Sequence, residues 1–329
     1  YVIDKKKDKL AGQGVIVKTQ VTSGLIAKIA EQNNMKCIGD LLVGFKFIGE
    51  VMNQLEKEGK IDNFLFGAEE SHGFLAGNYV RDKDAVLPAI WLSELAAELK
   101  DQKLTIIDYL RGIYSKYGYF RNYLTEIRLP GAEGMSQIKI IQDTLKTYPP
   151  KLVGRFELDH VEDWMDRKPI LSETDKAAKS GMVFYFKPVE GTSSMRVTVR
   201  PSGTEPKSKM YFEIGSIPFD EADYEHTKKR IEEIKTEFEQ AFMKACYKTL
   251  NIDFPDRGFL LFWQLPLQDK LKYFEVETEI IKLNEEKDVN TRKQKLYELL
   301  SFLGSDPIKK VDDAFKAEYK SGLLEYLNL

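Results

Sequence analysis

The sequence predicts an α/β layered domain with a mixed sheet, followed by an α+β domain and a helical C-terminal extension. Strand-like and helix-like segments alternate up to Tyr117, which is typical of a layered α/β domain. After Gly118 strand-like segments predominate, and this favours an antiparallel sheet with helices on one face. From Ile252 onward the pattern is helical. The expected domains are residues 1–118, 119–251 and 252–329.

In the first domain, short apolar runs bounded by turn residues alternate with segments of helical periodicity. Thr22 and Ser23 are N-cap candidates for a helix that ends at Asn33 and Asn34. The other expected elements are strands at 15–17, 38–43 and 64–66 and helices at 45–58, 85–100 and 105–117.

The second domain contains alternating apolar and polar residues, which indicate strands with one buried face. A helix is expected at 134–147, where Pro149 and Pro150 stop it, and another begins with Asp220 as N-cap. The expected strands are 119–129, 155–161, 182–187, 195–199 and 209–214.

The extension ends in a helix that begins at Asp306 and Pro307, a cap residue followed by an N1 proline. Gly304 ends the helix before it. The last helix carries an apolar stripe, and packing onto the preceding domain is favoured over a subunit interface. A homo-oligomer remains an alternative. The stripe consists of Ile308, Val311, Phe315 and Tyr319.

Composition excludes several classes of partner. Apolar residues make up 43% and charged residues 31%, and the net charge is −3, so neither a nucleic-acid nor a membrane partner is expected. The most apolar short run, 259–267, is far below the ~20 residues of a membrane span. Cys37 and Cys246 form no metal or disulfide pattern, which favours a reducing, cytoplasmic location. The start at Tyr1 and the lysine-rich lead predict a fragment, or a processed or trimmed chain.

A candidate anion-binding turn, Arg-Pro-Ser-Gly-Thr-Glu-Pro-Lys, joins two of the expected strands at 200–207. Its arginine offers a planar fork of donors, its serine and threonine offer hydroxyls, and its glycine lets a ligand approach the backbone. This chemistry suits a phosphate, although an ordinary basic hairpin with a polar turn has the same composition. The candidate phosphate-binding residues are Arg200, Ser202, Gly203, Thr204 and Lys209.

A second candidate site follows the strand at 64–66, at the edge of the sheet where α/β domains bind ligands. Glu69-Glu70-Ser71-His72-Gly73 could bind sugar hydroxyls, bind a metal or perform acid–base chemistry. A metal is disfavoured because adjacent ligands in one turn rarely converge and no His-x-x-x-His spacing exists, so no metal ligand is assigned. A charged surface turn is the alternative.

The two motifs together resemble the alpha-D-phosphohexomutases, the phosphoglucomutase and phosphomannomutase family. R-P-S-G-T-E-P-K is similar to the family's phosphate-binding loop, and G-A-E-E-S-H-G, which precedes it as in the family, is similar to the sugar-binding loop. The resemblance implies that Glu69 and Ser71 hold the ring hydroxyls of the sugar, with His72 close by. The paired glutamates resemble the glucose-type and pentose-type mutases.

Two lysines also match the family. Val17-Lys18-Thr19 resembles the strand-end lysine at the reaction centre, which implies that Lys18 stabilises charge or transfers a proton. Gly44-Phe45-Lys46 resembles the family's T-G-F-K, with Val43 in place of threonine, and implies that Lys46 helps to hold phosphate or sugar. A lysine after a strand is more often a solvated surface charge.

The phosphoserine loop and the aspartate-rich magnesium loop of the family do not occur in this sequence. Phosphoryl transfer needs positive charge, usually Mg²⁺, at the transferring group. The resemblance therefore covers about residues 1–250 and implies the C-terminal half of a mutase, inactive alone, whose partner is the missing N-terminal half. It implies a phosphosugar substrate, Mg²⁺ bound outside this chain and glucose 1,6-bisphosphate as intermediate. A phosphopentomutase, a non-catalytic phosphosugar-binding module, and relic motifs with the extension as an interaction surface are the alternatives.

Overall fold

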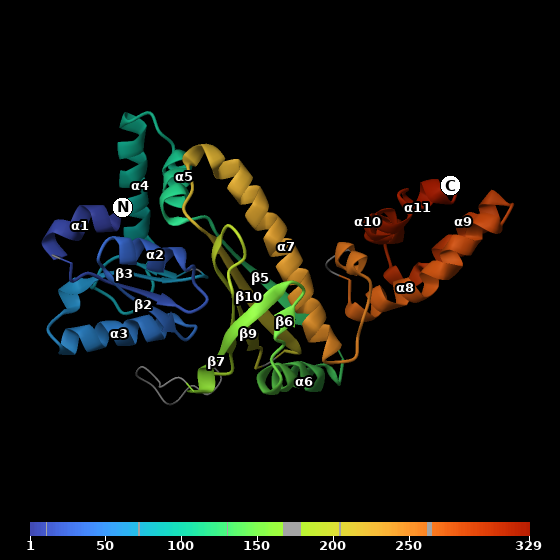
Figure 1. Cartoon of the computed structure of the whole chain (residues 1–329), viewed down its shortest axis with the longest axis horizontal. Helices are drawn as coiled ribbons and strands as arrows, with labels where there is room; N and C mark the ends of the chain where they lie inside the picture. Colours follow the sequence, from blue (N-terminus) through green and yellow to red (C-terminus); the bar gives the residue numbers. More distant parts are fainter. Residues whose placement is uncertain (11, 72, 130, 167–178, 204, 262–264) are drawn as a thin grey trace. The chain divides into compact units, whose positions relative to one another are not determined.

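The computed structural model describes residues 1–10, 12–71, 73–129, 131–166, 179–203, 205–261 and 265–329 (Figure 1). These residues form two compact units. The first unit consists of residues 1–126, 148–203 and 208–239, and the second consists of residues 127–147, 204–207 and 240–329. The predicted domain boundaries at residues 118 and 251 stay a prediction, because the limits of the two compact units do not test them.

The first sheet has the strand order β2-β1-β3-β4. Strands β1, β2 and β3 are parallel, and the short β4 pairs antiparallel with β3. Its strands are β1 (Val15–Thr19), β2 (Lys36–Leu41), β3 (Phe64–Glu69) and β4 (Gly73–Leu75). The helices of this part of the chain are α1 (Val2–Leu10), α2 (Leu25–Gln32), α3 (Phe45–Lys57), α4 (Val86–Asp101) and α5 (Ile106–Tyr117).

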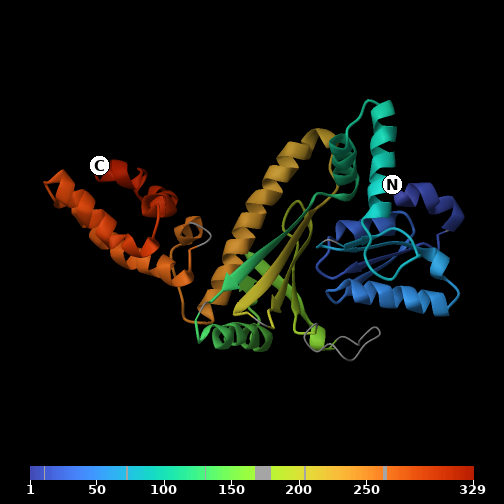
Figure 2. The same cartoon turned by 180° about the vertical axis from the view of Figure 1, so that it is seen from behind.

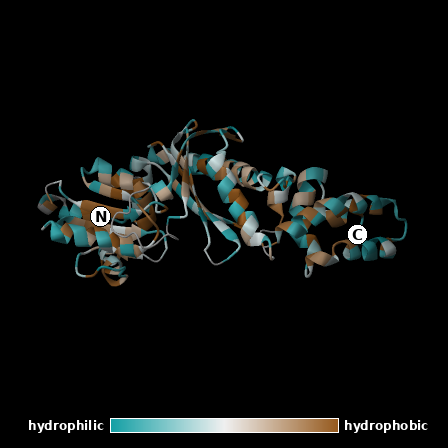
Figure 3. Cartoon of the chain, turned by 90° about the horizontal axis from the view of Figure 1, so that it is seen from below, coloured by the Kyte–Doolittle hydropathy of each residue, from teal (hydrophilic) through white to brown (hydrophobic). Residues whose placement is uncertain are grey.

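Strand β1 is buried along its whole length because helices cover both faces of the sheet. Val15 and Val17 point to α3 and join a core with Ile48 and Met52. Ile16 points to the opposite face and packs with residues of α1 and α2. Figure 1 shows α2 and α3 on opposite sides of these strands, and Figure 3 shows the hydrophobic strands between the helices. The predicted α/β layered arrangement is confirmed.

The second sheet has the order β5-β10-β9-β8-β7-β6, and the pairs from β10 to β6 are antiparallel. Its strands are β5 (Phe120–Arg128), β6 (Leu152–Val153), β7 (Phe156–Asp163), β8 (Met182–Phe186), β9 (Thr192–Pro201) and β10 (Lys207–Ser216). The helices that accompany it in sequence are α6 (Gly134–Thr147) and α7 (Tyr224–Lys248).

Aromatic side chains fix α7 along one face of the second sheet (Figure 2). The ring of Phe238 lies 4.9 Å from Phe156, 4.8 Å from Phe186 and 5.7 Å from Phe212, centroid to centroid, in edge-to-face geometry. Such contacts add to the stabilisation that burial of the rings provides. The predicted α+β arrangement, with helical residues covering an antiparallel sheet, is confirmed.

The extension forms α8 (Leu267–Lys282), α9 (Val289–Leu299), α10 (Pro307–Tyr319) and α11 (Leu323–Tyr326), as the sequence predicts. Asp306 is the N-cap residue of α10 and Pro307 is its first residue. The stripe of α10 was expected to pack onto the preceding domain. Val311 and Phe315 instead join a core that the helices of the extension make among themselves, within 261–329.

Helix α1, the short strands β4 and β6, and one helix cap differ from the sequence prediction. Helix α1 covers the lysine-rich lead, because Ile3 is buried against the first sheet and gives this polar segment an apolar anchor. Strand β4 has only three residues, too few for a periodic pattern. The N-cap position of α2 belongs to Gly24 rather than to Thr22 or Ser23, although Ser23 Oγ accepts a hydrogen bond from the Leu25 amide at 3.3 Å.

Candidate functional site

The turn between β3 and β4 presents the acidic motif. Glu69 is the last residue of β3 and pairs with Gly73, the first residue of β4, and Glu70 and Ser71 lie in the turn that follows β3. A β-carbon at position 73 would lie 2.1 Å from Glu69 Cγ, so only glycine permits this pairing. Ser71 is exposed on the turn, and His72 lies outside the described residues.

Glu69 is buried, at 8% exposure, but its carboxylate is paired. Lys83 Nζ donates to Glu69 Oε1 at 2.7 Å, and the lysine itself keeps 43% of its side-chain exposure. This bond is the main reason that the pKa of Lys83 is raised. A buried carboxylate needs such compensation to stay ionised, and it keeps further lone pairs for ligand hydroxyls.

The neighbouring Glu70 connects the acidic turn with the basic hairpin. The pKa of its carboxyl is raised, first because surrounding protein displaces water from it and then through the charge of Glu69, although the residue as a whole is exposed. The cations Arg200 and Lys209 act in the opposite direction on the same carboxyl. Charges that change the pKa of a group lie near that group. The structure therefore brings the two sequence motifs together.

Arg200 and Lys209 lie directly opposite each other on β9 and β10. Arg200 is half-buried and bonds to the hydroxyl of Tyr211, the next side chain on the same face of β10. The Nε atom of Arg200 is buried and has no hydrogen-bond partner among the described residues. A buried guanidinium donor without an acceptor is costly, and a bound phosphate would supply one.

The turn that follows Arg200 has room for a ligand. Ser202 is half-buried and Gly203 is exposed. A β-carbon built at Gly203 would meet no atom within 4 Å, so the backbone there borders open space. Thr204, the fifth predicted phosphate-binding residue, lies outside the described residues.

Lys18 is buried near the end of β1, with 3% exposure. Its ammonium donates to the carbonyl oxygens of Thr19 at 3.1 Å, Thr22 at 3.0 Å and Gly39 at 3.2 Å. These bonds use all three of its donors, so contact with a ligand requires the exchange of one carbonyl. Burial, followed by the charge of Arg196, lowers the pKa of Lys18 to about 8. Its role at the reaction centre stays a prediction.

The lowered pKa of Lys18 gives a testable dependence of stability on pH. Folded Lys18 releases its proton near pH 8, whereas an unfolded lysine holds it to about 10.5. The unfolded state therefore binds more protons between these values, and stability rises with pH. We expect the free energy of unfolding of the wild type, minus that of Lys18→Met, to rise by at most about 1.4 kcal/mol per pH unit in this window.

Urea unfolding at several pH values measures this difference. Lys28→Met is the control, because Lys28 lies on α2 with 46% of its side chain exposed. Its difference from the wild type should not change with pH. Parallel curves for Lys18→Met and the wild type would contradict the lowered pKa of Lys18.

Lys46 lies in the first turn of α3, directly after Phe45, and is exposed. Its ammonium lies 5.1 Å from the ring centroid of Phe47. The N-cap residue Gly44 has φ +132°, a conformation that favours glycine at this turn. The loop therefore positions Lys46 at the start of a helix, and its contact with phosphate or sugar stays a prediction.

Sequence reasoning did not identify two residues of this site. Lys83 lies 14 residues after Glu69, and no local pattern marks it as the partner of that residue. Tyr211 could have been found, because it lies two residues after Lys209 in a strand and therefore shares its face.

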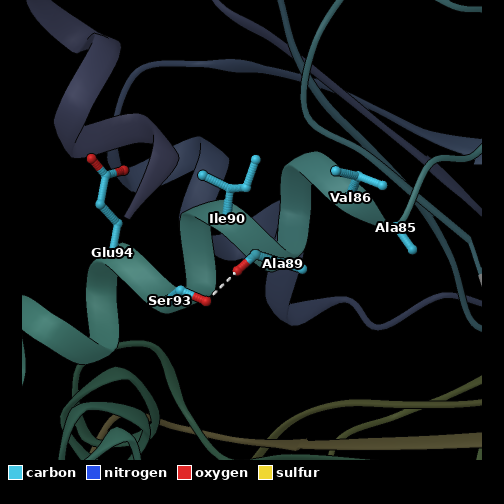
Figure 4. A pocket seen from close by; sticks show the side chains of 6 residues that line it. All are labelled: Ala85, Val86, Ala89, Ile90, Ser93 and Glu94. Carbon is cyan, nitrogen blue, oxygen red and sulfur yellow. Dashed lines mark hydrogen bonds between the residues drawn. The ribbon is translucent and has the colours of Figure 1, made fainter.

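A shallow hollow on α4 has different chemistry (Figure 4). Val86, Ala89 and Ile90 line it together with Ala85, and Ser93 donates to the Ala89 carbonyl at 2.8 Å. Glu94 is the charged residue in this lining, so the hollow offers no cation to a phosphate.

Two further properties concern the described residues. No group of three or more His, Cys, Asp or Glu side chains is arranged to hold a metal ion there. Nor does any helix in the described part of the chain have the length and apolar character needed to cross a membrane.

Comparison with known proteins identifies relatives over part of the chain. Residues 1–117 match the model "Phosphoglucomutase/phosphomannomutase, alpha/beta/alpha domain III". A phosphoglucomutase of Staphylococcus aureus strain N315 is 32% identical over 212 residues, which are 63% of this chain and 37% of that protein. The phosphoglucomutase of strain MRSA252 is 32% identical over 213 residues, with the same shares of both chains. The chain thus spans 37% of the length of these curated relatives.

Among solved structures, pp63/parafusin, a phosphoglucomutase from Paramecium in its open form, is similar with a TM-score of 0.45 and 20% identity. The likeness covers 69% of this chain and 38% of that one. The domain match and the relatives show that residues 1–117 are similar to the third domain of phosphoglucomutases and phosphomannomutases, and that 63% of the chain is similar to phosphoglucomutases. The match of residues 1–117 to the third domain fits the predicted place in the C-terminal half of such an enzyme.

Proposed function

We propose that this chain supplies the sugar-binding and distal-phosphate-binding part of a phosphoglucomutase-type enzyme, which interconverts sugar 1-phosphate and 6-phosphate. The observation that carries the proposal is the convergence of the acidic turn and the basic hairpin, because Glu70 lies in the field of Arg200 and Lys209. Hydroxyl acceptors and phosphate donors then belong to one site. The phosphoglucomutases among the relatives support the glucose-type substrate.

The side chains have distinct roles in this proposal. The Arg200 fork and the Lys209 ammonium bind the phosphate that does not react, and the open backbone at Gly203 lets that phosphate approach. Glu69 accepts hydrogen bonds from neighbouring ring hydroxyls, while Lys83 donates to its Oε1 atom. The bisphosphate intermediate must turn so that either of its phosphates can react. A site that recognises a phosphate group rather than the sugar can bind the intermediate in both orientations.

The described residues do not fit the Mg²⁺ that the family implies. They contain no cluster of three carboxylate, imidazole or thiolate ligands, and Glu69 is already paired with Lys83. Mg²⁺ needs several oxygen ligands in octahedral geometry. We therefore assign to this chain the binding and orientation of the phosphosugar, and place the metal ligands elsewhere in the enzyme.

Replacement of Glu69 by glutamine tests the sugar contact. Glutamine keeps one carbonyl oxygen but loses the charge and one acceptor, and its amide cannot attract Lys83. We expect weaker binding of glucose 1-phosphate and a smaller preference for it over galactose 1-phosphate. The affinity for inorganic phosphate should remain the same. Titration calorimetry on the purified chain measures all three ligands.

Glu157→Gln is the matched control, because Glu157 forms an exposed ion pair with Lys187 at 2.6 Å. This control should leave all three affinities unchanged. An unchanged preference between the two sugars in Glu69→Gln would remove Glu69 from the sugar site. The same purified chain should bind glucose 1-phosphate without converting it, and measurable conversion would contradict the assignment of the chemistry to other residues of the enzyme.

A further inference from the structure

A buried ion pair joins the two strands that carry the phosphate hairpin. Arg196 Nε lies 2.9 Å from Glu213 Oε1, and their side chains are only 12% and 5% exposed. Glu213 Oε2 accepts two further hydrogen bonds, from Gly24 N and from Asn122 Nδ2, both at 2.6 Å. A buried pair is stable only when its remaining polar atoms are satisfied in this way.

The pair is connected to Lys18 through a single carbonyl group. The Thr22 carbonyl accepts a hydrogen bond from Lys18 Nζ at 3.0 Å and another from Arg196 Nη2 at 3.2 Å. Two residues further on, the backbone of Gly24 donates to Glu213. The segment from the end of β1 to the start of α2 is therefore held by both members of the pair.

The local chain geometry is adapted to this contact. A β-carbon at Gly24 would lie 2.7 Å from Glu213 Oε1 and 3.2 Å from the ring of Phe120. Any larger residue at position 24 would push the carboxylate away from the backbone amide. The close approach thus depends on glycine at a position where φ is −64°, a value that other residues also adopt.

The same hairpin face carries the phosphate-binding residues. On β9 and β10, Arg196 lies opposite Glu213 and Arg200 lies opposite Lys209. The strand register is uninterrupted between these two residue pairs. Residues four apart in a strand lie on the same face. At ~3.3 Å per residue, the two residue pairs are about 13 Å apart along the strands. The hairpin therefore contacts the Lys18 segment through Arg196 and Glu213. Four residues along the same strands, it carries the candidate phosphate site at Arg200 and Lys209.

We propose that Arg196 and Glu213 are positioning residues, which fix the segment 19–24, and with it Lys18, at a set distance from the Arg200–Lys209 phosphate site. This inference rests on the proposed function, because it concerns a ligand that spans the two places. A phosphosugar contacts both ends of this arrangement, whereas inorganic phosphate contacts only the hairpin. The pair thus couples the geometry of the two ends without touching the ligand.

The Glu213→Gln variant tests this coupling. Glutamine has the same shape, but it leaves Arg196 without a counter-charge beside Lys18. The groups that act on Lys18 are Arg196 from β9, Glu213 from β10, and Cys37 and Asp40 from β2. Arg196 lowers the pKa of Lys18 and Glu213 raises it, so the variant should release the Lys18 proton at lower pH.

Two measurements are made on this variant. The pH profile of Lys18 acylation, followed by mass spectrometry, should move to lower pH, and in the double variant Arg196→Met/Glu213→Gln it should move back. Calorimetry should show at least a fivefold loss of affinity for glucose 1-phosphate and less than a twofold change for inorganic phosphate. Glu232→Gln is the control, because Glu232 pairs with Arg121 at a half-exposed site and should change neither result.

The outcomes separate this inference from the proposed function. If the wild-type chain binds no glucose 1-phosphate, the proposed function fails, while the acylation profile still reports on the contact with Lys18. An unmoved acylation profile overturns the positioning of Lys18, and equal losses for both ligands overturn the coupling. Should Glu213→Gln fail to fold, Gly24→Ala, which keeps all the charges, is expected to give the same selective loss for glucose 1-phosphate. An unchanged affinity in that variant overturns the inference.

Discussion

Replacement of Arg200 by alanine is expected to weaken the binding of glucose 1-phosphate to this chain about 5- to 150-fold. This range corresponds to about 1–3 kcal/mol, the cost of losing a charge-assisted hydrogen bond. Arg200 is half-buried opposite Lys209, and its Nε donor has no acceptor among the described residues. Phosphate would satisfy that donor, so the variant removes the main reason for the anion to bind there. Titration calorimetry measures the change.

Inorganic phosphate should lose affinity by a similar factor in this variant, because the proposed contact is to the phosphate rather than to the sugar. Arg200→Lys should give an intermediate loss, since lysine keeps the charge but lacks the planar fork. Arg155→Ala is the control, because Arg155 is exposed and pairs with Glu237 at 2.8 Å. Equal affinities for Arg200→Ala and the wild type would show that the hairpin is not the phosphate site.

The regular elements could be predicted where local pattern and packing agree. Helix α6 has the expected bounds, because its apolar positions and the prolines after it are local signals. The alternation of apolar and polar residues over 195–199 predicts one buried face and one polar face, yet Thr198 on the polar face has 1% exposure. The alternation of apolar and polar residues shows which residues share a face of the strand. It does not show that both faces of the second sheet are covered. The burial of this face depends on distant chain segments.

The candidate site was predictable to a similar extent. Both motifs could be located from the sequence, and the charges around Glu70 show that they converge. The ion pair of Lys83 with Glu69 and the three carbonyl contacts of Lys18 could not be predicted, because each depends on the path of a loop in space. The roles of Lys18, Lys46 and Ser71 toward a ligand stay predictions, as do those of His72 and Thr204.

Replacement of Arg257 by alanine is expected to destabilise the helical extension by about 3–5 kcal/mol. Arg257 binds Glu277 through two parallel contacts of 2.5 Å and 2.6 Å, and the side chains are 13% and 5% exposed. Alanine would leave the Glu277 carboxylate buried, with the hydroxyl of Tyr273 as a neutral donor at 2.8 Å. Hydrogen exchange of the α8 and α10 amides measures the local stability of this region.

A matched pair of variants separates the cost of an unpaired charge from the value of the ion pair. The double variant Arg257→Met/Glu277→Leu removes both charges and keeps apolar volume beside Phe274, whose ring lies 5.0 Å from the guanidinium. Buried pairs replaced in this way often leave stability unchanged or raise it, so this variant should recover most of the loss. Lys295→Ala, which breaks a more exposed pair with Glu286, should cost about 0–1 kcal/mol. If Arg257→Ala costs no more than Lys295→Ala, Glu277 must reach water or another partner without Arg257. The extension would then be held by its apolar core alone.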